Sequence, residues 1–136
     1  MAITYLIVAG VSGVLFGVLD GVINANPLAQ KLLAVYQPIA RPSVNAIAGI
    51  LIDLTYGFVM AGLFVILYEG LPGATGLVKG ISFALVAWFF RVVMQAASQW
   101  IMFIVPKRLI AYTLATGLGE MLVLGFLYGL TLSPAA

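Results

Sequence analysis

Four apolar stretches, each long enough to cross a lipid bilayer as a helix, dominate this chain. They lie at roughly 2–25, 44–68, 76–105 and 108–131, and about 20 apolar residues suffice for a hydrocarbon core of about 30 Å. A chain with 64% hydrophobic and only 7% charged residues cannot hide that much apolar surface inside a soluble domain of 136 residues. The sequence therefore predicts an all-α integral membrane protein, with one transmembrane domain of four helices over residues 1–136.

Prolines and glycines mark the connections between these stretches. The first connection contains Pro27, Pro38 and Pro42, the second contains Pro72, and the third is the short segment 106–108. The third connection is short enough to make the last two spans antiparallel neighbours, and we expect the four spans to form two antiparallel hairpins. The residues between the first two prolines carry apolar side chains on one helical face, which favours a short interfacial helix between the first two spans.

The basic residues of the connections predict the orientation of the chain. The first and third connections hold Lys31, Arg41, Lys107 and Arg108, whereas the second holds only Lys79. The positive-inside rule then predicts that both chain ends lie outside, N-out and C-out. No run of positive charge precedes the first apolar stretch, so we interpret it as a span and not as a secretory leader. We expect a multi-pass protein of a prokaryotic inner membrane.

The residue types that are absent exclude several classes of function. The chain contains neither histidine nor cysteine, which excludes the usual ligands of zinc, haem and iron–sulfur clusters and the usual thiol nucleophiles. No serine has a histidine partner for nucleophilic catalysis. We therefore expect no cofactor, no metal site and no enzymatic activity, with a paired-carboxylate hydrolase built on Asp53 and Glu120 as a remote alternative. The small net charge lies in the connections, so nucleic acid is not an expected partner.

Four charged residues lie inside the apolar stretches, namely Asp20, Asp53, Arg91 and Glu120. An isolated charge at that depth costs at least ~3 kcal/mol, so each needs a partner or a proton. Arg91 lies 15 residues before Pro106 and Glu120 lies 14 residues after it, which puts both at about the same depth on antiparallel neighbours. The spacing therefore predicts an ion pair between Arg91 and Glu120.

Further polar residues share helical faces with these charges. Gln95, Ser98 and Gln99 follow Arg91 at three- and four-residue spacing, and Thr116 precedes Glu120 by one turn. We expect a polar seam inside the bundle, formed by Asp53, Arg91, Gln95, Glu120, Ser98, Gln99, Thr116, Tyr56, Asp20 and Asn24. Asp20 is the weakest member on this reasoning, because it is close enough to Pro27 to reach interfacial water near Lys31 or Arg41.

The charges in the polar seam leave two functional interpretations open. Three carboxylates face one guanidinium, so Asp53 is expected either to carry a proton or to compete with Glu120 for Arg91. A movable proton or a bound cation then follows, and we expect a membrane protein that binds or moves a small solute, proton or cation. The alternative is a non-transporting accessory subunit of a larger membrane complex, in which the ion pair locks the fold. Four helices enclose little space, so a homo-oligomer or a membrane partner subunit is expected besides the lipid bilayer.

Overall fold

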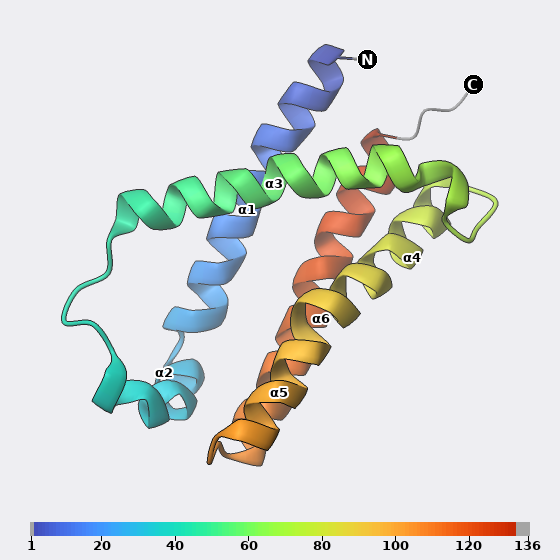
Figure 1. Ribbon diagram of the computed structural model, residues 1–136. Coiled ribbons are helices and arrows are strands. Elements are labelled where there is room, and N and C mark those ends of the chain that lie inside the picture. Colours follow the sequence, from blue (N-terminus) through green and yellow to red (C-terminus); the bar gives the residue numbers. More distant parts are fainter. Residues whose placement is uncertain (1, 133–136) are drawn as a thin grey trace.

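The computed structural model describes residues 2–132, and within that range it contains helices and no strands (Figure 1). Four helical segments are long and apolar enough to cross a membrane: Ala2–Ala25, Ala46–Gly70, Gly76–Met102 and Lys107–Thr131. The predicted all-helical class and the number of membrane-crossing helices are therefore confirmed. This composition and these lengths indicate a multi-pass membrane protein.

The first connection is helical from Pro27 to Ile39. Helix α1 (Ala2–Ala25) is followed by α2 (Pro27–Leu33) and a 3-10 turn, η1 (Ala34–Ile39). The Asn26 side chain accepts a hydrogen bond from the Ala29 backbone at 2.9 Å, and Pro27, which has no amide hydrogen to leave unpaired, begins α2. A short helix thus occupies the expected position, while its location at a membrane interface remains a prediction.

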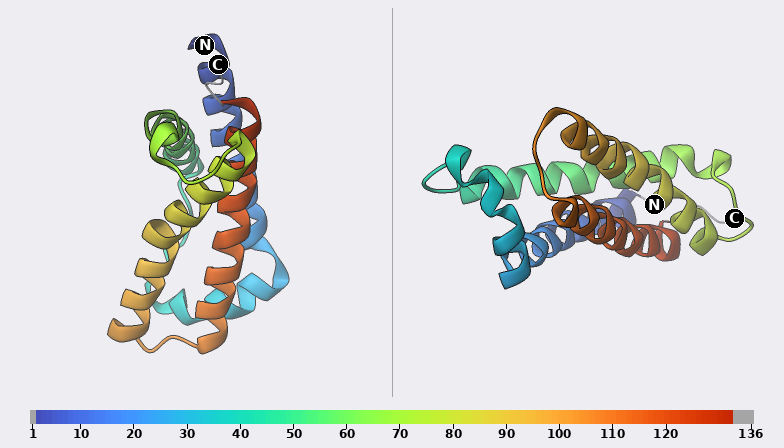
Figure 2. Two further views of the ribbon diagram at one scale, coloured as in Figure 1. Left: turned by 90° about the vertical axis from the view of Figure 1, so that its right-hand side faces the viewer. Right: turned by 90° about the horizontal axis from the view of Figure 1, so that it is seen from below.

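Helix α3 (Ala46–Leu67) crosses α1 steeply and does not run beside it, so the hairpin expected from the first two spans is not confirmed (Figures 1 and 2). The two helices touch where Gly57 meets Gly13: a Cβ atom on Gly57 would lie only 2.5 Å from the Gly13 Cα atom. Two glycines without side chains allow this close backbone approach. Beyond the C-terminal end of α3, a short turn, η2 (Tyr68–Gly70), leads toward the second half of the chain.

The third membrane-crossing segment is not a uniform α-helix. It consists of α4 (Gly76–Trp88), a π-helical turn η3 (Phe89–Val93) and α5 (Met94–Met102). Helix α6 (Lys107–Thr131) follows, and Figures 1 and 2 show α4 and α6 side by side. Glycines again mediate the contact, because a Cβ atom on Gly129 would lie 2.5 Å from the Gly76 carbonyl oxygen.

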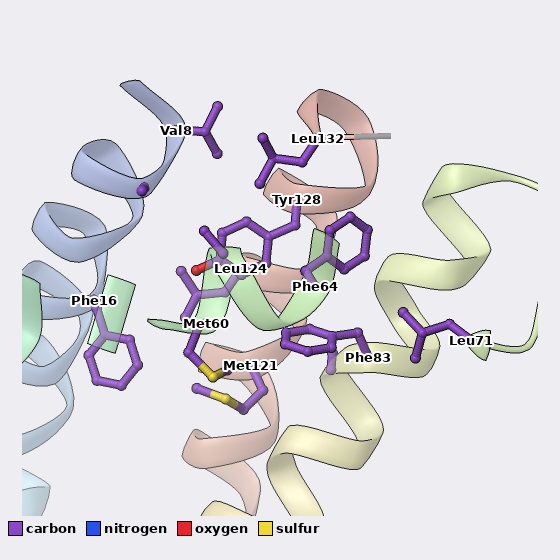
Figure 3. Close-up of a cluster of buried hydrophobic side chains, with 13 residues drawn as sticks. Val8, Phe16, Met60, Phe64, Leu71, Phe83, Met121, Leu124, Tyr128 and Leu132 are labelled. Carbon is purple, nitrogen blue, oxygen red and sulfur yellow. The ribbon is translucent and has the colours of Figure 1, made fainter. Parts of the chain in front are cut away.

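A cluster of aromatic rings joins α3 to α4 and α6 (Figure 3). The ring centroid of Phe64 lies 5.5 Å from that of Phe83 and 5.8 Å from that of Tyr128. Met121 and Leu124 pack against the same cluster, and both are fully buried. The hydrophobic core therefore lies toward the C-terminal end of α6, and the polar residues lie closer to its N-terminal half.

Candidate functional site

Arg91 and Glu120 are in contact between the third and fourth membrane-crossing segments. Arg91 Nη1 lies 3.2 Å from Glu120 Oε1, and the Glu120 side chain is only 1% exposed. Arg91 is the central residue of the π-helical turn η3, a kind of irregularity that often marks functional positions in helices. The structure therefore brings the two side chains together, and their state as an ion pair remains a prediction.

The Arg91 guanidinium group also lies over two aromatic rings from the first half of the chain. Its central carbon is 4.6 Å from the ring centroid of Phe16 on α1 and 5.1 Å from that of Tyr56 on α3. These two rings stack on each other, with centroids 4.9 Å apart and planes tilted by 7°. Attraction between a cation and aromatic faces is favourable at these distances. Arg91 therefore joins α6 to α1 and α3.

Asp20 lies close to both Asp53 and Glu120. Gly17 makes room for Asp53, since a Cβ atom on Gly17 would lie 3.1 Å from Asp53 Oδ2. The Glu120 Oε2 atom is buried and accepts no hydrogen bond from any described residue. The weakest member of the sequence-based seam, Asp20, is thus at its centre, because α1 packs against both α3 and α6.

An open-sided cavity of about 870 Å³ lies beside these charged groups. Its size falls within the usual range of sites for small molecules. Eight of the ten residues predicted for the polar seam line it: Asp20, Asn24, Tyr56, Arg91, Gln95, Gln99, Thr116 and Glu120. The predicted seam and the cavity wall therefore overlap closely.

Asp53 and Ser98 are not among the residues that line this cavity. Asp53 lies against Gly17 and close to Asp20. Ser98 is exposed and donates a hydrogen bond to the Met94 carbonyl oxygen of its own helix at 2.9 Å. The α-helical period used to align Ser98 with Arg91 fails here, because the π-helical turn has more residues per turn and rotates every residue after it.

Sequence reasoning missed two tyrosines that line the cavity, Tyr36 and Tyr112. The Tyr112 hydroxyl donates to the Ile23 carbonyl oxygen at 2.5 Å and accepts from Asn26 Nδ2 at 2.7 Å. The Tyr36 hydroxyl lies 3.4 Å from Gln99 Oε1. Tyr36 lies within the first connection and Tyr112 follows the third, positions also typical of interfacial anchors, so the sequence offered no signal to separate the two roles.

The chemistry available at this site is electrostatic and proton-exchanging. Among the described residues, no group of three or more aspartates and glutamates is arranged to hold a metal ion. Carboxyl groups, one guanidinium and several amides and hydroxyls can bind a charged or polar molecule and can exchange protons with it. No protein-family model, no curated protein and no solved structure matches this chain.

Proposed function

We propose that this protein is a non-enzymatic membrane protein that binds or moves a small solute, proton or cation through the polar seam. One observation carries the proposal: the cavity of about 870 Å³ has Asp20, Arg91 and Glu120 in its wall. Each is part of a segment apolar enough to cross the bilayer. Ionisable groups at such positions mark binding sites and proton pathways in membrane proteins.

The number of carboxyl groups favours binding or transport over a purely structural role. A lock between α6 and the third membrane-crossing segment requires only Arg91 and Glu120, which are 3.2 Å apart. Asp20 and Asp53 add two further acidic groups beside that pair, and each additional charge inside the bilayer costs a few kcal/mol, about 3 in cellular insertion measurements. A role in binding a proton or a cation explains the presence of these two additional acidic groups.

The arrangement in the membrane belongs to the same proposal. We place both chain ends outside a prokaryotic inner membrane and α2 with η1 at its inner surface, because the basic residues gather in the first and third connections. The two antiparallel hairpins expected from the sequence are part of this proposal, and they require α3 to turn alongside α1 in the bilayer from the steep crossing that the structure shows. A homo-oligomer or a partner subunit completes the path for a solute, since one copy of the chain leaves the cavity open at one side.

A second candidate function is that of a non-transporting accessory subunit. The N-terminal half of α3 favours it, because Ile47 is 72% exposed and Ile50 and Leu51 are each 59% exposed. Such an apolar surface packs equally well against lipid tails or against another membrane protein. In this case the contact between Arg91 and Glu120 locks the bundle, and the cavity has no substrate.

Reconstitution in liposomes tests the proposed function. Purified protein should mediate a proton or solute flux, detected with a pH-sensitive dye inside the vesicles, and Asp53→Asn or Asp20→Asn should abolish it while the helical circular dichroism stays unchanged. Glu69→Gln is the matched control, because Glu69 is an exposed acidic residue in the second connection. Wild-type protein that is folded but carries no flux, with a loss of stability in Glu120→Gln, would favour the accessory subunit instead.

A further inference from the structure

The wall of the cavity carries an excess of negative charge. Among the described residues that line it, the charged ones are Asp20, Arg91 and Glu120, and Arg91 is already matched by Glu120 at 3.2 Å. Within the same part of the chain Asp20 forms no ion pair, and Asp53 adds a further carboxyl group close to it. The buried Glu120 Oε2 atom also lacks a hydrogen-bond donor among the described residues. The site therefore repels anions and attracts a positive charge.

The remainder of the wall is aromatic and aliphatic. Aromatic rings come from both halves of the chain, and so do aliphatic side chains; the rings belong to Tyr36, Tyr56, Phe83, Phe90 and Tyr112. Aromatic faces stabilise organic cations, above all quaternary ones, that cannot donate hydrogen bonds. A cavity of about 870 Å³ is far larger than a bare inorganic ion needs, and inorganic cations require several oxygen ligands at short range. The wall thus matches a cation that carries apolar groups.

Resting on the function proposed above, we propose that the substrate class is monovalent lipophilic organic cations. The positive centre lies beside Asp20 and Glu120, and the apolar substituents of the cation contact Tyr56, Phe83 and Phe90. Arg91 does not bind the ligand: it remains with Glu120 and with the rings of Phe16 and Tyr56. An isolated carboxylate pair would be strongly repulsive, so Arg91 limits the negative charge of the site.

The titratable and charged groups at this site come from five elements: Asp20 on α1, Tyr36 on η1, Asp53 and Tyr56 on α3, Arg91 on η3, and Tyr112 and Glu120 on α6.

Two probes of the same shape and opposite charge provide the test. Tetraphenylphosphonium and tetraphenylborate are titrated by equilibrium dialysis against the purified full chain in dodecyl maltoside micelles, with protein-free micelles as the blank. We expect saturable binding of tetraphenylphosphonium and none of tetraphenylborate. Asp20→Asn should weaken the binding at least about tenfold, Asp20→Glu should restore most of it, and Glu69→Gln should leave it unchanged.

The sign of the preferred charge decides the outcome even if Asp20→Asn fails to fold, because it is measured on the wild-type chain. Equal binding of the two probes, preference for tetraphenylborate, or no binding of tetraphenylphosphonium would overturn the substrate class. If the liposome experiment nevertheless shows a flux, the proposed function stands with another substrate. If neither experiment gives a signal, both proposals fail.

Discussion

Arg91 lies 3.2 Å from Glu120, and its guanidinium group also covers the rings of Phe16 and Tyr56. One side chain on the π-helical turn therefore contacts three other membrane-crossing helices. The aromatic cluster of Phe64, Phe83 and Tyr128 joins the same two halves of the molecule further along α6. The Arg91 guanidinium group is thus a principal contact between α1 and the second half of the chain.

Glu120→Gln should reduce the stability of the protein more than removal of the other carboxyl groups. It leaves Arg91, whose side chain is 26% exposed, without its acidic partner. Breaking a buried pair costs roughly 3–5 kcal/mol, and we expect the lower end because Arg91 is partly exposed. Thermal unfolding followed by circular dichroism in detergent provides the measurement.

The exchange of both charges, Arg91→Glu with Glu120→Arg, distinguishes a paired lock from two independent contributions. If the two residues stabilise each other, the double variant should recover part of the stability that each single variant loses. Additive losses in the double variant would show that the two side chains do not act as a pair.

Gly13→Ala should weaken the crossing of α1 and α3. A Cβ atom at this position would lie 2.9 Å from the Leu54 Cα atom, which is backbone and cannot move aside. Overpacking of this kind costs about 1–3 kcal/mol. Gly21→Ala is a control on the same helix, since nothing lies within 4 Å of its added Cβ atom, and the better helix former should stabilise the protein by about 0.5–1 kcal/mol. A matching loss of stability in both variants would refute the close crossing.

Lys79→Met should loosen the turn between η2 and α4. Lys79 Nζ donates to the Tyr68 carbonyl oxygen at 2.6 Å and to the Leu71 carbonyl oxygen at 3.1 Å. The same atom lies 4.7 Å above the ring of Tyr68. Loss of these partly buried contacts should cost about 1–3 kcal/mol and increase amide hydrogen exchange in the turn. Lys107→Met changes an exposed lysine at the start of α6 and should leave exchange in that turn as it is.

The proposed orientation can be tested with single cysteines, because the chain contains none. In intact cells, Glu69→Cys should react with a membrane-impermeant maleimide added from outside. Lys107→Cys should react only after the membrane is permeabilised, because the third connection is expected inside. The reverse labelling pattern would show that the chain has the opposite orientation.

The sequence by itself determined the helical class and the number of membrane-crossing segments. Both depend on local properties: apolar stretches of bilayer length and the prolines and glycines that interrupt them. The proximity of Arg91 to Glu120 was also accessible, because both positions are counted from the same short turn at Pro106 and the two segments have no room to separate there.

The tertiary structure alone decided how the first half of the chain meets the second. Asp20 lies close to Asp53 and Glu120 because α1 packs against both α3 and α6. The π-helical turn at Phe89–Val93 shifts Ser98 away from the cavity. The regular α-helical period that we assumed for the sequence does not reveal this turn. Interhelical crossings depend on contacts between residues far apart in the chain, such as Gly13 with Gly57, and no local pattern specifies which glycine meets which.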